Sequence, residues 1–150
     1  MLIDNNLLFS DAQAVTATAG STNIIDTAPL FSGNLGRRVG NGKPIYIFIS
    51  VDVAFTDSGS DSTIAVTVET DDNTSMSSAT TVATITTFAA LTAAGTKFFA
   101  PLPIANYERY IGIRYTAANG NLTTGSFTAG LVLNVDDFYA TAGGFTTGVE

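Results

Sequence analysis

Residues 44–55 read PIYIFISVDVAF, and this stretch decides the fold. Every second side chain is apolar, and in a β-strand alternate side chains point to the same face. The opposite face changes from apolar Phe48 to polar Ser50 and Asp52, so we expect it to be covered at one end only. The pattern predicts one half-buried strand, whose inward face is formed by Ile45, Ile47, Ile49, Val51, Val53 and Phe55.

Strand-like patterns continue on both sides of this stretch. Residues 15–26 read as a first strand that is interrupted at Gly20 and Ser21. Residues 56–62 (TDSGSDS) are a polar turn, which predicts that residues 44–55 and 63–70 form a hairpin-like pair. Further strands are expected over residues 82–88, 97–103, 109–116 and 126–135.

Details of these later stretches predict their places in a sheet. The apolar set shifts phase between Val82 and Ile85, as a bulge would produce. Two prolines make residues 97–103 suitable for an edge strand. The alternation places Ile111, Ile113 and Tyr115 inward in one strand, and Phe127, Ala129, Leu131, Leu133 and Val135 inward in the last. Seven or eight strands with polar turns, and no helical pattern, predict an all-β antiparallel sandwich.

The segments around these strands suggest three parts. We expect an apolar N-terminal arm over residues 1–14, a β-sandwich domain over residues 15–137, and a flexible or partner-bound tail over residues 138–150. Docking of the arm on its own domain and on a neighbouring molecule both fit the residues. Residues 27–43 are rich in glycine and read as a long loop.

Composition narrows the possible functions. The chain has no cysteine and no histidine, so the thiolate ligand and the usual proton shuttle of catalysis are both missing. Thirteen acidic against six basic residues give a net charge of −7, which opposes direct binding to nucleic acid or to an anionic membrane. No apolar run is long enough to span a bilayer.

Several groups of residues contain the atoms that a chemical site would need. Asp57 and Asp61, or Asp71 and Asp72 with Asn73, offer oxygen ligands for calcium, but turn formation explains both groups and we expect no metal and no cofactor. No spacing singles out a carboxylate pair among Asp52, Glu69 and Glu108, so we do not expect an enzyme. Rings that could form a sugar platform are better explained by packing, namely Tyr107, Tyr110, Tyr115, Phe98 and Phe99.

Several segments of the sequence resemble those of one known group of proteins. The opening MLID and FSDAQAVTATAGSTNIID at residues 9–26 are similar to the start of the capsid cement, or decoration, proteins of tailed phages. The same order continues with GNGKP at residues 40–44, ETDDN at 69–73, YIGIRY at 110–115 and LVLNV at 131–135.

The resemblance implies a jelly-roll-like sandwich of about eight strands that acts outside the phage head. Such a protein forms a homodimer or homotrimer and clamps neighbouring major capsid proteins on the outer surface of the virion. Under this interpretation the arm reaches a neighbouring subunit, and Arg37 and Arg38 are candidates for contact with an acidic partner, although a solvated charge pair also explains them. The candidate contact residues of the arm are Leu2, Ile3, Leu7, Phe9, Asp11 and Gln13.

A carbohydrate-binding sandwich, either lectin-like or part of a tail fibre, is the alternative from another functional class. It predicts a concave groove with measurable sugar affinity.

Overall fold

The computed structural model describes residues 4–27, 37–38 and 44–133. A short 3₁₀ turn, η1 (Asn5–Leu7), precedes the strands. The strands are β1 (Leu8–Ala14), β2 (Ala19–Gly20), β3 (Ile25–Asp26), β4 (Arg37–Arg38), β5 (Tyr46–Thr56), β6 (Thr63–Asp71), β7 (Thr80–Ala89), β8 (Lys97–Pro101), β9 (Asn106–Tyr107), β10 (Tyr110–Ala118) and β11 (Thr124–Val132). All strand pairs are antiparallel.

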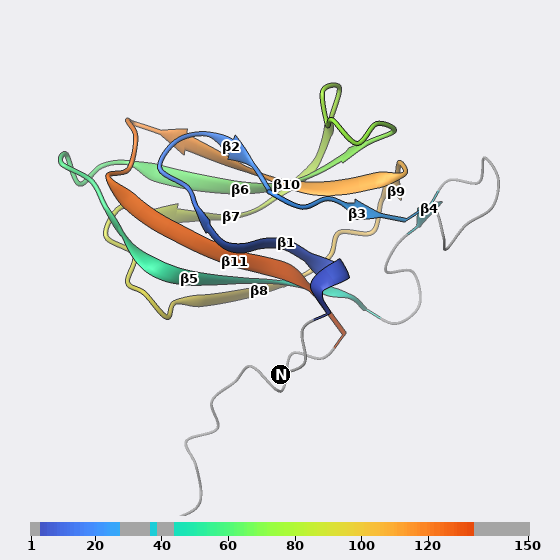
Figure 1. Cartoon of the computed structure of the whole chain (residues 1–150), viewed down its shortest axis with the longest axis horizontal. Helices are drawn as coiled ribbons and strands as arrows, with labels where there is room; N and C mark the ends of the chain where they lie inside the picture. The colour runs from blue at the N-terminus through green and yellow to red at the C-terminus, as the bar shows by residue number, and fades with distance from the viewer. Residues whose placement is uncertain (1–3, 28–36, 39–43, 134–150) are drawn as a thin grey trace, which may run out of the picture.

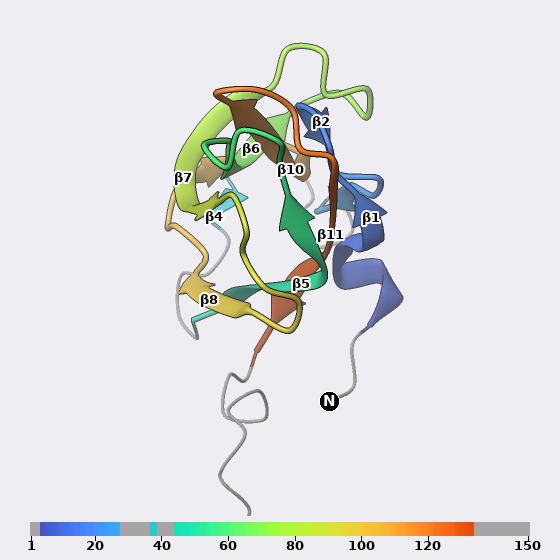
Figure 2. The ribbon, with the colours of Figure 1, turned by 90° about the vertical axis from the view of Figure 1, so that its left-hand side faces the viewer.

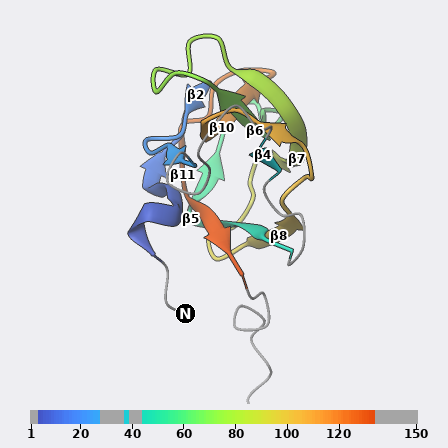
Figure 3. The ribbon, with the colours of Figure 1, turned by 90° about the vertical axis from the view of Figure 1, so that its right-hand side faces the viewer.

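Two sheets form the layers of a sandwich (Figure 1). The first has the order β1-β11-β5-β8, and the second has the order β2-β10-β6-β7, with β3 also paired to β10. Figures 2 and 3 show β1 and β2 on one side of the sandwich and β7 and β8 on the other. Because most consecutive long strands lie in opposite sheets, this order is that of a jelly roll. The expected all-β sandwich is therefore confirmed.

Strand β5 lies inside the first sheet and contributes much of the core. Ile47, Ile49, Val51 and Phe55 are buried as the alternation predicted, but Val53 is 51% exposed. The pairing register between β5 and β11 shifts on both sides of the Val53–Ser126 pair, and such irregularity turns a side chain away from its expected face. The prediction was wrong at this one position.

The outer face of β5 is covered at one end, as expected. Phe48 is buried in a second apolar cluster on that face, whereas Asp52 is exposed near the other end of the strand. The cluster consists of Leu8, Phe48 and Val132 with the partly buried Tyr46 and Phe99.

Strands β5 and β6 do not form the expected hairpin. Strand β5 pairs with β11 and β8, whereas β6 pairs with β10 and β7 in the other sheet. The polar segment between them therefore crosses from one sheet to the other. Alternation identifies the buried face of each strand but not its neighbour, because both sheets bury the same kind of face.

Other details of the pattern agree with the structure. The register between β6 and β7 shifts twice, and each shift leaves Val82 or Ile85 without a direct partner on β6, which confirms the predicted bulge. Ile111, Ile113 and Tyr115 are buried, and β8 is an edge strand. Leu133 is 59% exposed because β11 ends before it, which corrects its predicted inward position; Val135 lies outside the described residues.

Aromatic rings join the two sheets in the core. The ring of Phe127 on β11 stacks on Tyr115 of β10 at 4.9 Å between centroids. It also lies 4.8 Å from the ring of Phe55 and 5.3 Å from the ring of Phe88, which comes from β7. Pairs in such geometries stabilise a core beyond the area that they bury.

The N-terminal segment belongs to the sandwich from Leu8 onward. Strand β1 pairs with β11, and Phe9 is fully buried in the core of its own chain. Of the two alternatives for the arm over residues 1–14, the structure shows docking on its own domain for Leu8–Ala14, which forms an edge strand. In the described part of the chain, no helix has the length and apolar character that a membrane crossing requires.

Candidate interaction surface

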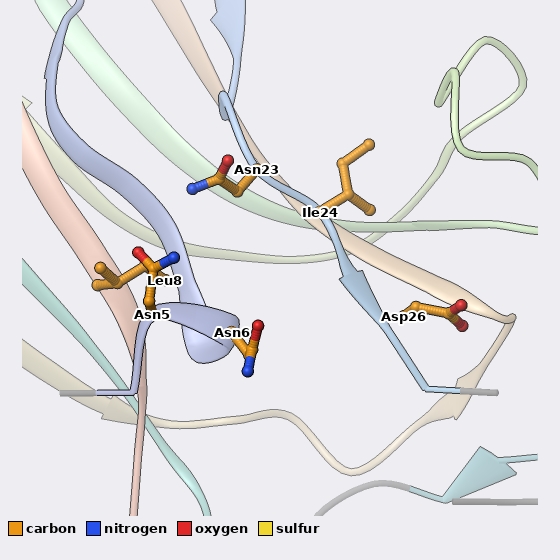
Figure 4. A pocket seen from close by; sticks show the side chains of 6 residues that line it. All are labelled: Asn5, Asn6, Leu8, Asn23, Ile24 and Asp26. Carbon is orange, nitrogen blue, oxygen red and sulfur yellow. The ribbon is translucent and has the colours of Figure 1, made fainter. Parts of the chain in front are cut away.

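A polar pocket opens where the N-terminal turn faces the segment that leads into β3. Its volume is about 520 Å³. Figure 4 shows Asn5, Asn6 and Leu8 on one side of it, and Asn23, Ile24 and Asp26 on the other. The pocket therefore lies between segments that the sheet order places at the β1 and β3 edges of the sandwich.

Hydrogen bonds hold both walls. Asp4 caps η1, because its carboxylate accepts from the Asn6 backbone N–H at 2.9 Å and its carbonyl accepts from the Leu7 N–H at 2.9 Å. The Asn23 N–H donates to the carbonyl of Phe9 at 2.9 Å, which attaches the second wall to β1. Asp26 is held by Arg109, whose guanidinium donates two hydrogen bonds of 2.9 and 3.1 Å.

The pocket offers free amide groups. The side chains of Asn5, Asn6 and Asn23 make no hydrogen bond to any residue that the structure describes. Each amide has two donors and an acceptor, so it can bind a peptide backbone or a sugar hydroxyl. Leu8 and Ile24 add apolar contact area beside them. The pocket is therefore suited to adhesion to a polar, extended partner.

The predicted contact residues of the arm divide into different roles. Phe9 is fully buried in the core, so it does not present its ring to a neighbour as the sequence suggested. The burial of Phe9 follows from the pairing of β1 with β11, which turns its ring between the sheets. Leu7 is only partly buried against the core, and its contact with a partner stays a prediction. Leu2 and Ile3 lie outside the described residues.

Gln13 links parts of its own chain. Its Oε1 accepts from the Ser10 hydroxyl at 2.7 Å and from the Thr22 N–H at 2.9 Å. Its Nε2 donates to the carbonyl of Gly20 at 2.8 Å. These bonds hold the side chain within its own chain. Gln13 is partly exposed, so its contact with a partner stays a prediction.

Asp11 remains exposed at an irregular point of β1. The next residue, Ala12, has φ 45°, and its N–H donates to the Thr128 hydroxyl at 2.9 Å. The register of β1 against β11 shifts here, so Asp11 projects from the edge. Of the predicted arm residues within the described part, Asp11 is the one with an exposed side chain.

Arg37 and Arg38 form the short strand β4. It pairs with β9, with Arg37 opposite Tyr107 and Arg38 opposite Asn106. The side chains of both arginines lie outside what the structure describes. Their contact with an acidic partner stays a prediction.

The acidic turns cap their own backbones, as the sequence predicted. The Asp57 carboxylate accepts from the Ser62 hydroxyl at 2.8 Å and from the N–H groups of Asp61 and Ser62. The Ser62 hydroxyl is the largest cause that lowers the pKa of Asp57 from 3.8 to about 2. Such bonds favour the charged form of the carboxylate.

Asp71 performs the same role in the turn after β6. Burial disfavours its charged form, but hydrogen bonds from Asn73 and Ser78 outweigh burial and lower the pKa of Asp71. One carboxylate oxygen from each of Asp71, Asp72 and Glu108 lies within 4.8 Å of the other two. Because Asp71 is already bonded within its turn, capping accounts for its position.

The other candidate carboxylates are separated by the fold. Glu69 on β6 is buried, and both of its oxygens accept from Arg114 Nε at 2.8 and 2.9 Å. Asp52 lies on β5 in the opposite sheet and accepts from the Thr128 hydroxyl at 2.6 Å. The structure therefore does not bring these two carboxylates together on one sheet.

The rings considered as a sugar platform pack within the sandwich. Tyr107 and Tyr115 are buried, which confirms the packing interpretation for them. Burial raises the pKa of each phenol to about 12. Tyr110 is half-buried, and the Arg109 guanidinium lies 4.9 Å from the centre of its ring.

Comparison with known proteins gives one finding. The model of a protein family described as Bbp16 matches residues 9–131, which begin in β1 and end in β11. No curated protein matches the chain. The matched range contains Asn23, Ile24 and Asp26 of the pocket, whereas Asn5, Asn6 and Leu8 precede it.

Proposed function

The chain belongs to the Bbp16 family, and from this membership we propose that it is a structural virion protein which cements the outer surface of a tailed-phage head. The family match over residues 9–131 carries the proposal, because it spans nearly the whole sandwich and the family name suggests a phage-related group. The proposed partners are neighbouring major capsid proteins and further copies of this chain.

The polar pocket supports an adhesive role. Its amides are free of intramolecular bonds in the described structure, and it lies beside η1 at the β1 and β3 edges of the sandwich. An extended segment of a capsid protein would satisfy these amides with its backbone, in the manner of strand addition. Contacts of this kind between backbone and side-chain amides need no catalytic side chain.

A cement protein stabilises a shell through many modest contacts. A ligand that binds only the assembled state stabilises that state by mass action. Repetition around a closed shell multiplies the effect, because each copy that bridges two subunits holds both in place. The proposed function therefore requires a stable body with adhesive edges, and the jelly roll supplies both.

Co-sedimentation with capsids tests the proposal at the pocket. The chain is mixed with heads assembled from a tailed-phage major capsid protein, and binding is measured over a concentration series. Asn23→Ala removes one free amide, so we expect about fivefold weaker binding. Asn121→Ala is the matched control, because Asn121 is exposed and lies outside the pocket. If Asn23→Ala binds heads as tightly as the natural chain does, the pocket is not part of the interface. If the natural chain does not bind heads, the cement function is refuted.

A carbohydrate-binding role is the second candidate, and the same pocket favours it. Amide and carboxylate groups beside small apolar surfaces bind sugar hydroxyls. Titration of a glycan panel distinguishes the two. Saturable sugar binding that Asn23→Ala abolishes, without binding to heads, would replace the cement proposal with this one.

A further inference from the structure

The lateral edges of the two sheets differ in how they are protected. Unpaired edge strands are natural templates for association, and proteins block them with lysine, proline, bulges or short length. Strand β8 has five residues and carries Lys97 and Pro101. The edge of β1 is irregular, because its register against β11 shifts twice, and its Phe9 carbonyl already accepts from the Asn23 N–H and the Thr22 hydroxyl. Strands β2 and β3 have two residues each.

Strand β7 is the exception among these edges. It is ten residues long, and among the strands that the structure describes it pairs with β6 alone. Residues 73–96, which contain β7 and both of its flanking turns, include no charged residue and no proline. Apart from bonds to β6 and within its own turn, no residue of the described structure hydrogen-bonds to the backbone of β7.

The side chains of β7 leave this edge accessible. The bulges point Val82 and Ile85 toward the core, against which both pack. Threonines are exposed between and beside them, at positions 81, 84 and 87. After the second bulge the stretch 86–89 pairs regularly with residues 63–66 of β6, so its outer backbone groups have ordinary strand geometry.

We infer that β7 pairs with β7 of a second copy of this chain in antiparallel orientation, which joins the two β6–β7 sheets into one. Charge favours this edge, because two chains of net charge −7 repel each other and meet best where neither carries a charge. Threonine pairs across antiparallel strands add favourable contacts. The inference is independent of capsid binding and can hold or fail on its own.

The same geometry limits the assembly to two copies. A twofold contact is self-complementary, so one pairing uses the β7 edge of both copies. The other edges that the structure describes are short or irregular, and they offer no second site of this kind. The dimer is therefore closed and does not extend into a fibre.

Sedimentation equilibrium of the full chain tests the inference. We expect a reversible dimer, and Thr87→Lys is expected to raise its dissociation constant at least about fivefold, because like charges then meet across the twofold axis. Thr116→Lys makes the same change in charge on β10, which is paired on both sides, and it should leave the dimer unchanged. A natural chain that stays monomeric, or equal effects of the two substitutions, would overturn the inference.

Hydrogen exchange keeps the test decisive if Thr87→Lys does not fold. In the natural chain, amides of residues 86–89 that point away from β6 should exchange more slowly at high concentration than at low concentration. Amides of β8 should show no such dependence. Exchange in residues 86–89 that does not depend on concentration would contradict the inference.

Discussion

The hydroxyl groups of Ser10 and Tyr115 lie 2.7 Å apart and connect β1 of one sheet with β10 of the other. The Ser10 hydroxyl donates its single proton to Gln13 Oε1, so Tyr115 is the donor in the bond between the two hydroxyls. Gln13 in turn donates to the carbonyl of Gly20 on β2. This chain of hydrogen bonds closes one side of the sandwich.

Removal of the Tyr115 hydroxyl should lower the stability of the protein by a small but measurable amount. Tyr115→Phe keeps the ring stacked on Phe127 and leaves Ser10 bonded to Gln13, so the free energy of unfolding should fall by about 1 kcal/mol. Urea titration followed by circular dichroism measures it. Tyr110→Phe is the control, because Tyr110 makes no hydroxyl hydrogen bond within the described residues, and its effect should be near zero. Equal losses in both variants would contradict a role for the inter-sheet bond.

The buried phenol of Tyr115 predicts a loss of stability at alkaline pH. Burial is the main cause that raises its pKa from 10 to about 12. Because the folded state favours the protonated form, the stabilisation is complete below pH 10 and is lost as the pH rises toward 12. Absorbance titration of phenolate should lose one late-ionising group in Tyr115→Phe. Loss of a group that ionises near pH 10 instead would contradict the prediction.

The Asp57 turn predicts a change at acidic pH. The lowered pKa means that the contribution of Asp57 is present above pH 3.8 and is lost as the pH falls to about 2. Ser62→Ala removes the largest cause, so the pKa of Asp57 should rise toward 3.8. Carbon-13 NMR titration of the carboxyl group measures this shift. A pKa that stays near 2 would show that the backbone N–H donors alone are enough to lower the pKa of Asp57.

Gly125 has no room for a side chain. Its φ is 153°, and a Cβ atom there would overlap the ring of Phe55, which is buried. Gly125→Ala should therefore lower the free energy of unfolding by about 2 kcal/mol or more. Gly20→Ala is the control, because no atom lies within 4 Å of the corresponding position. Similar stability of the two variants in thermal unfolding would contradict the predicted overlap.

The local part of the fold was predictable from the sequence, and the pairing of strands was not. Alternation identified Ile47, Ile49 and Val51 as core residues because strand geometry alone decides the face of each side chain. The exposure of Val53 depends on the register against β11, whose residues lie more than 70 positions away. The separation of β5 from β6 likewise depends on long-range packing, such as that of Phe55 on Phe127.

The candidate surface was largely missed for a related reason. Asn5, Asn6 and Asn23 form no motif, and their free amides become evident only when the partners of the surrounding polar groups are known. Gln13 shows the converse, because a polar residue in a predicted arm proved to be bonded within the chain. A run of adjacent asparagines before an apolar strand was the one available signal.

A density map of intact virions tests most directly the central claim that this chain cements the outer surface of a phage head. In particles of the phage that encodes this chain, we expect a jelly-roll sandwich on the outer surface of the head, in contact with at least two neighbouring major capsid proteins. Heads that lack the protein should show bare shells at those positions and should release DNA at a lower temperature. A head surface without this sandwich in particles that contain a complete shell would contradict the account.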